Sequence, residues 1–159
     1  MAPADHALLV RILVGFALGY VCGFERRLRG SVAGDRTFAL VGGGAAAITA
    51  VVAKTSPQAI AGIVTGVGFI GGGLLFRGEM GAIRGITTAA TIFTTAAIGI
   101  VVGYGHLLLG VIATGLFLLT LELQNIPVLR CLDADKYVGR FKNDHVEQSN
   151  ADEGRPSIG

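Results

Sequence analysis

Two stretches without a charged side chain limit what this chain can fold into. They run from Gln58 to Phe76 and from Ile86 to Gly103. Each is about as long as a helix that crosses the hydrocarbon core of a bilayer, so together they predict a transmembrane helical hairpin. Only 15% of the residues are charged, against roughly 25% in soluble domains, and 52% are hydrophobic. The sequence therefore predicts an integral membrane protein built as one compact bundle.

Three further apolar runs complete an all-α fold of five transmembrane helices. The five helices are expected at about 7–24, 37–53, 58–76, 86–103 and 107–123, within a transmembrane domain of residues 1–124. Residues 125–159 are polar and of mixed charge, and they are too few to bury a core of their own. We expect this segment to be a short, partly disordered cytoplasmic tail.

The distribution of Lys and Arg predicts the orientation. Arg26, Arg27, Arg29 and Arg36 lie in the first loop, Arg77 and Arg84 in the third, and five more basic residues in the tail, whereas Lys54 alone lies in a loop on the opposite side. Because cytoplasmic loops carry the excess of Lys and Arg, the N-terminus is expected outside and the C-terminus in the cytoplasm.

Glycines inside the apolar runs predict close helix packing. Small residues let helix backbones approach each other in lipid. The candidate packing positions are Gly15, Gly19, Gly23, Gly62, Gly66, Gly68, Gly72, Gly99 and Gly103. Arg11 shares a helix face with Gly15, and two interpretations stay open: it reaches the nearby membrane surface, or it is a functional charge that faces the bundle.

Threonines and loop charges are the candidate functional groups. Thr87, Thr91, Thr94 and Thr95 share one side of the fourth helix, where their hydroxyls either bond to their own backbone or line a path for an ion. The charges Glu25, Arg26, Asp35, Arg36 and Arg84 come from two loops on the same membrane face. They either fix topology and bind anionic headgroups, or form a salt-bridged cap with a site for an ion, phosphate or protein partner.

The motifs of common enzymes are missing. The sequence has no Walker lysine, no HExxH and no Cys/His cluster, and Gly66-x-Gly68-x-x-Gly71 lies within an apolar run rather than after a strand. We therefore expect a protein that is not an enzyme, with no cofactor, no metal site and no nucleic-acid partner.

Four segments give the chain a family resemblance. GFERRLRG at 23–30, AGDRTFALVGGGAA at 33–46, GIVTGVGFIGGGLLF at 62–76 and IRGITTAATIFTTAAIGIVVG at 83–103 resemble the MgtC/SapB family of bacterial inner-membrane proteins. The resemblance implies a multi-pass protein linked to growth under magnesium limitation, acid or phosphate stress, and survival in macrophages. It also implies regulation through partners, including the F-type ATP synthase.

Transferring the family pattern gives a list of candidate positions. They are Glu25, Arg26, Arg36, Thr37, Arg84, Gly85, Thr87 and Thr88. Thr87 stands where the virulence branch has an important asparagine, and Asp35 where many relatives have an apolar residue. That branch also has a folded cytoplasmic C-terminal domain, so the resemblance favours a short SapB-like member.

Two functions therefore remain open at the level of sequence. The first is a regulator of magnesium homeostasis or stress adaptation that acts through the lipid bilayer, membrane partners or a homo-oligomer. The second is a small ion channel or transporter, although the second to fourth apolar runs contain no acidic residue of the kind that a cation site usually needs.

Overall fold

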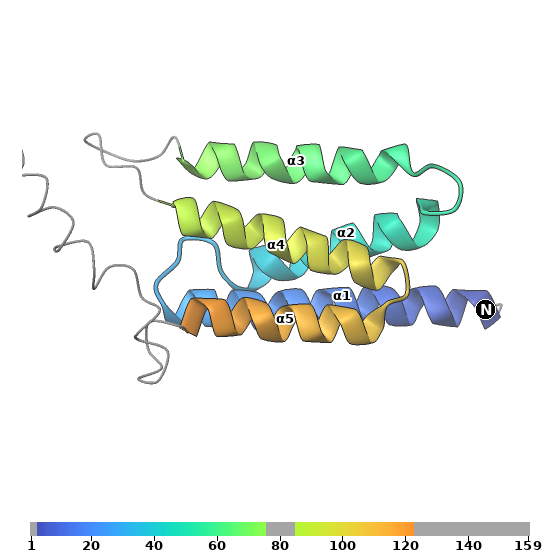
Figure 1. The fold of residues 1–159 in the computed structure, drawn as a ribbon, viewed down its shortest axis with the longest axis horizontal. Helices are drawn as coiled ribbons and strands as arrows, with labels where there is room; N and C mark the ends of the chain where they lie inside the picture. The colour runs from blue at the N-terminus through green and yellow to red at the C-terminus, as the bar shows by residue number, and fades with distance from the viewer. Residues whose placement is uncertain (1–2, 76–84, 123–159) are drawn as a thin grey trace, which may run out of the picture. The chain divides into compact units, whose positions relative to one another are not determined.

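Every regular element that the structure describes is a helix. The computed structural model describes residues 3–75 and 85–122. Its helices are α1 (Pro3–Leu28), α2 (Asp35–Val52), α3 (Gln58–Leu75), α4 (Ile86–Gly103) and α5 (Leu107–Glu122), and α1 to α4 run alternately up and down (Figure 1). The prediction of an all-α fold with five helices is confirmed within these residues. Helices α1 to α4 are long and apolar enough to cross a membrane, and α5 is a shorter apolar helix.

The chain divides into two units. Residues Met1–Leu118 form one compact unit, and residues Leu119–Gly159 form a second, of which the structure describes only the last turn of α5. The predicted tail at 125–159, Phe76 at the predicted end of the third helix, and the candidate Arg84 lie outside the described residues.

The first helix extends one turn further than its apolar run predicts. It ends at Leu28 rather than near Phe24, so Glu25 and Arg26 belong to the helix and not to a loop. Gly30 terminates it with a φ of 75°, while the Ser31 N–H donates to the Arg26 carbonyl at 3.0 Å. This is a Schellman C-cap, in which a residue in the left-handed region satisfies the last carbonyls. The next helix starts at Asp35, slightly before the expected Thr37.

Helices α1, α2 and α4 form the most tightly packed part of the first unit. A Cβ atom built on Gly15 would lie 2.5 Å from Ala46 Cβ, and one on Gly19 would lie 2.5 Å from the Phe38 carbonyl oxygen. Gly42 of α2 lies between the other two helices, since its Cβ would meet the Gly15 carbonyl oxygen at 2.8 Å and Thr95 Cγ2 at 3.4 Å. The backbones approach each other because these positions lack side chains.

The remaining glycines of α1 and α4 lie in the same contact region. Gly23 lies against the start of α2, where a Cβ built on it would be 2.6 Å from Asp35 Cα. A Cβ built on Gly103 would be 2.6 Å from Thr49 Cβ. Gly99 lies against the Gly42 carbonyl and Ala45. The glycines of the first and fourth helices thus face α2.

Helix α3 packs against α4, but four of its predicted packing glycines do not share in close packing, which corrects that expectation for them. A Cβ atom on Gly62, Gly66, Gly68 or Gly72 would meet no atom within 4 Å. The buried residues of α3 are Val67 and Gly71, and Gly71 makes only ordinary contact with Ala89 of α4. In Figure 1 α3 lies at one edge of the bundle, next to α4. Gly62, Gly66, Gly68 and Gly72 are therefore not covered by another helix of the described chain.

Candidate functional site

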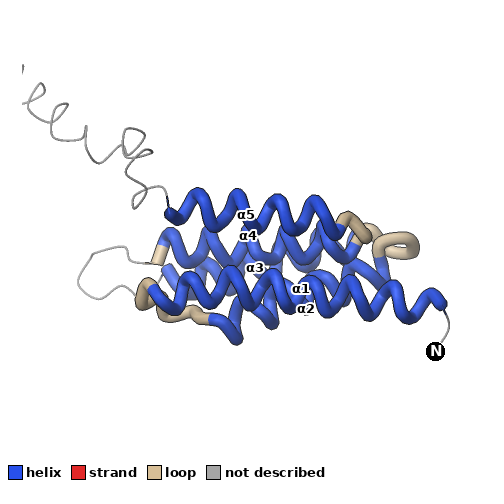
Figure 2. Tube along the Cα trace, turned by 90° about the horizontal axis from the view of Figure 1, so that it is seen from below, coloured by secondary structure: helices blue, strands red, loops and turns tan. Residues whose placement is uncertain are grey.

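The described candidate residues gather at one end of the first unit. The α1–α2 turn and the start of α4 lie at the same end of the helices (Figure 2). Ser31 Oγ in this turn lies 3.3 Å from Thr88 Oγ1 in the first turn of α4, within hydrogen-bonding distance. Thr88 and the turn residue Ala33 are buried. The turn is therefore held against α4 by a polar contact and by apolar burial.

Glu25 and Arg26 are largely withdrawn from solvent in the last turns of α1. The Glu25 side chain is 13% exposed, and it forms an ion pair with Arg29 one turn further along the helix. Apart from that ion pair, neither Glu25 carboxylate oxygen nor Arg26 Nε has a hydrogen-bond partner in the described chain. Polar atoms that are buried without a hydrogen bond lower the stability of the folded state, so these atoms destabilise the end of α1. A salt-bridged cap involving Arg84 falls outside the described residues.

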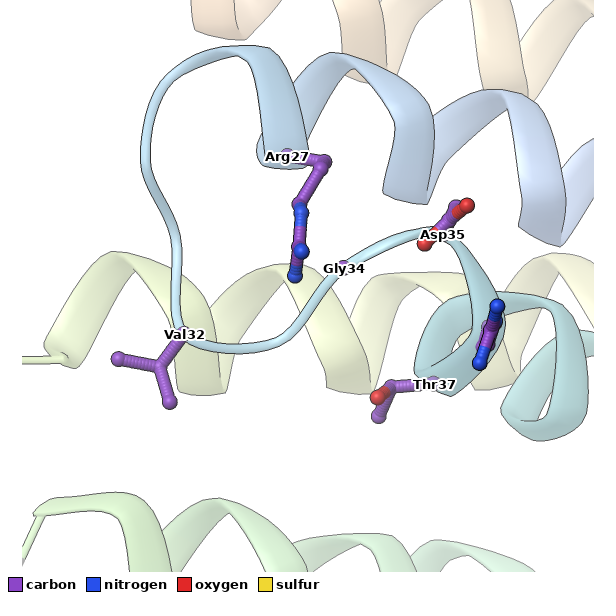
Figure 3. A pocket seen from close by; sticks show the side chains of 6 residues that line it. Arg27, Val32, Gly34, Asp35 and Thr37 are labelled. Carbon is purple, nitrogen blue, oxygen red and sulfur yellow. The ribbon is translucent and has the colours of Figure 1, made fainter.

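A polar cavity of about 330 Å³ lies beside the α1–α2 turn (Figure 3). It is lined by Arg27, Val32, Gly34, Asp35, Arg36 and Thr37. The Arg27 side chain lies across Gly34, with its Cδ atom 3.1 Å from where a Cβ would be. Sequence reasoning listed three of these residues but missed Arg27, which it treated as a topology determinant. The available signal was the segment RLRGSVAGDR at 27–36, which has Arg27 before the turn and Arg36 after it.

The start of α4 holds the other candidates. Gly85 is its N-cap and has a φ of 93°, a left-handed conformation that residues with a side chain rarely adopt. Thr87 is exposed and Thr88 is buried. Further along, Thr91 Oγ1 donates to the Thr88 carbonyl, and Thr94 and Thr95 donate to the carbonyls of Ala90 and Thr91, each at 2.9 Å. These three hydroxyls are used within their own helix.

Arg11 lies at the opposite end and faces the bundle. Its Nη1 donates to the Gly103 carbonyl at 3.2 Å, at the last residue of α4. The guanidinium also lies against Gly105, which has a φ of 100°. A cation at this position satisfies a terminal carbonyl and opposes the negative end of the helix dipole. Arg11 therefore faces the bundle through a structural contact, and a functional role for its charge stays a prediction.

Two arginines determine the charge of the cavity at the α1–α2 turn. Among residues 3–75 and 85–122 no group of three or more His, Cys, Asp or Glu side chains is placed to hold a metal ion. Arg27 and Arg36 line one cavity, and neither is ion-paired to a carboxylate of the described chain. Such a site is suited to an anionic group.

These features define a class of protein, a small multi-helix membrane protein with a glycine-packed core and one polar end. The chain belongs to the MgtC family, whose model matches residues 12–126. It is 37% identical over 145 residues to SrpB of Synechococcus elongatus, covering 77% of this chain and 80% of SrpB.

Two other relatives are longer than this chain. MgtC of Brucella abortus is 37% identical over 123 residues, which cover 74% of this chain and 51% of that protein. YhiD of Escherichia coli K12, whose name provisionally describes a magnesium transporter, is 42% identical over 142 residues, which cover 80% of this chain and 64% of YhiD. The chain thus spans about half to two thirds of these two relatives. No solved structure matches it significantly.

Proposed function

We propose that this chain is a non-enzymatic bacterial inner-membrane protein that regulates magnesium homeostasis or stress adaptation by binding a membrane partner. Membership of the MgtC family supports the membrane location, and the name of the YhiD relative supports the link to magnesium. The observation that carries the regulatory part is the outward face of α3.

That face is lined with small residues at helical spacing. Ala61, Thr65, Gly68 and Gly72 follow each other at intervals of four, three and four, so they share one side of α3. The buried residue Val67 lies on the other side of α3, and Gly71, which contacts α4, lies at the edge of this face. Small residues at an interface let two transmembrane backbones pack closely, whereas they contribute little to a surface that faces only lipid. The partner on this face is another membrane protein or a second copy of the chain.

The orientation is part of the same proposal. The Arg-rich α1–α2 turn faces the cytoplasm, which leaves the N-terminus outside and the C-terminus inside. The polar end is then accessible to cytoplasmic ions and proteins, and the α3 face stays in the bilayer.

The test replaces one glycine of the face and compares it with a matched glycine elsewhere. In a host that depends on the chain for growth in low magnesium, Gly68→Leu is expected to abolish growth while membrane insertion and protein level stay unchanged. Gly115→Leu is the control, because Gly115 of α5 is also exposed and its Cβ would also meet nothing within 4 Å. Wild-type growth with Gly68→Leu, or equal loss with both variants, would contradict the proposal.

A second candidate, a small magnesium channel or transporter, is favoured by the name of the YhiD relative. Two observations weigh against it. The hydroxyls of Thr91, Thr94 and Thr95 are bonded within α4 rather than turned toward an ion path. No acidic residue lies within α3 or α4, and α2 has only Asp35 at its start.

A further inference from the structure

An apolar groove between α2 and α3 shares one lining residue with the polar cavity at the α1–α2 turn. The groove encloses about 480 Å³ and is lined by Leu40, Val41 and Ile48 of α2 and by Gly62, Gly66 and Ile70 of α3, among others. Thr37 lines both spaces. The polar chamber and the apolar groove therefore both reach the first turn of α2.

The groove is open because α3 has glycines where it faces α2. A Cβ on Gly62 or Gly66 would meet no atom within 4 Å, so no side chain fills this space. From Thr37 to Ile48 the helix advances eleven residues, or about 16 Å at the usual rise per residue. This is about half of a hydrocarbon core of roughly 30 Å, the depth of one leaflet.

The polar chamber has the charge that a phosphate diester requires. Its lining includes two arginines, Arg27 and Arg36, and one carboxylate, Asp35, so the lining side chains carry one net positive charge. No ion pair joins either arginine to a carboxylate in the described part of the chain. The chamber also lies at the N-terminal end of α2, where no side chain caps the backbone N–H groups. Both those N–H groups and the arginines favour a negatively charged ligand.

We propose that the two spaces together bind one phospholipid with a net negative headgroup. Its phosphate lies between Arg27 and Arg36, and one acyl chain lies in the α2–α3 groove. The single net charge of the chamber matches a phosphatidylglycerol-type headgroup, which has a phosphate and no ammonium group to balance it. Bound there, the lipid fills the gap beside α3 that the glycine packing of the chain leaves open.

The test uses the absence of tryptophan from the sequence. Ile70→Trp places the sole tryptophan at the groove, and Phe69→Trp, at a side chain that is 84% exposed, reports the bulk lipid. The full chain is reconstituted in phosphatidylcholine bilayers with a small fraction of brominated phosphatidylglycerol or brominated phosphatidylcholine. In the Ile70→Trp variant, brominated phosphatidylglycerol is expected to quench the fluorescence more strongly than brominated phosphatidylcholine does. In the Phe69→Trp variant, both lipids are expected to quench it equally.

Charge variants decide which residues select the lipid. Arg27→Gln and Arg36→Gln are each expected to reduce the preference for phosphatidylglycerol about fivefold, as for one basic residue near an anionic surface. Lys54→Gln is the matched control, because Lys54 is also exposed but lies in the α2–α3 turn at the other end of the helices. Both arginines are exposed, so their replacement leaves the core intact.

Three results would overturn the proposal. The first is equal quenching of the Ile70→Trp variant by the two brominated lipids, and the second is a preference that survives both arginine substitutions. The third is binding of inorganic phosphate by the reconstituted chain without any preference for brominated phosphatidylglycerol, which would make the chamber a site for free phosphate instead of a lipid.

Discussion

Gly19→Ala is expected to open the α1–α2 interface. The added Cβ would lie 2.5 Å from the Phe38 carbonyl oxygen, 0.9 Å short of the 3.4 Å at which ordinary contact begins. The obstacle is backbone, so no rotamer change relieves it, and the two helices must separate. That separation also loosens the close approaches at Gly15 and Gly23. Overpacking a core costs about 1–3 kcal/mol, and we expect a value near 3 kcal/mol here.

The buried thiol of Cys22 provides the assay. Cys22 is fully buried and lies one turn from Gly19. The sequence has one other cysteine, Cys131, which a Cys131→Ser substitution removes. In that background, the rate of maleimide labelling of Cys22 follows the population of the open state when opening and closing are fast. A loss of about 3 kcal/mol then raises the labelling rate about a hundredfold.

Gly66→Ala is the control for this prediction. Its Cβ would meet nothing within 4 Å, and alanine favours a helix by about 1 kcal/mol over glycine. We expect labelling of Cys22 to stay the same or to slow. Unchanged labelling in Gly19→Ala, or faster labelling in Gly66→Ala, would refute the assignment of the core to α1, α2 and α4.

Three further predictions concern the free energy of unfolding, measured by titration of mixed micelles with a denaturing detergent. Arg11→Met should lower it by about 2 kcal/mol, because the Gly103 carbonyl loses a charged donor, and Arg11→Lys should recover part of the loss. Thr49→Val should raise the free energy of unfolding by about 1 kcal/mol, because the fully buried hydroxyl has no hydrogen-bond partner in the described chain. Equal or lower stability would contradict the conclusion that this hydroxyl is unpaired. Gly85→Ala should lower the free energy of unfolding by about 1–2 kcal/mol, because a residue with a side chain is strained at the φ of 93° that Gly85 adopts. Gly85→Asn should cost less, and no effect of either substitution would mean that the left-handed N-cap is not required.

Apolar run length predicts the number of helices well and their ends less well. The five runs match five helices because lipid-length apolar segments have few alternatives to the helix. The run ends at Phe24, but α1 continues through Glu25 and Arg26 to the cap at Gly30. Hydropathy detects the apolar part of a helix, and the polar last turn is set by capping.

Glycine spacing identifies a face but not its partner. The faces that contain Gly15 and Gly99 lie against α2, whereas Gly62 and Gly68 carry the same signal and meet nothing in the described chain. A small-residue face is equally suited to a helix of its own chain, another chain or a lipid, so only the structure separates these cases. The central position of Gly42 was missed for the same reason.

Long-range partners of the candidate residues could not be predicted. Arg11 donates to a carbonyl 92 positions away, and Ser31 meets Thr88 across 57 positions. The cavity at Arg27 likewise depends on the path of the turn at Gly34. The sequence placed several charges on one face of the membrane, but which of them share a cavity is a property of the folded turn.

Magnesium and proton flux into proteoliposomes tests the central claim, that the chain regulates rather than transports. The full chain is reconstituted with Cys22 still protected from maleimide, which shows that the core is folded, and Thr87→Val is measured in parallel. The account predicts no flux above that of empty liposomes for either protein. Flux above that level, abolished by Thr87→Val, would contradict it and make α4 part of an ion path.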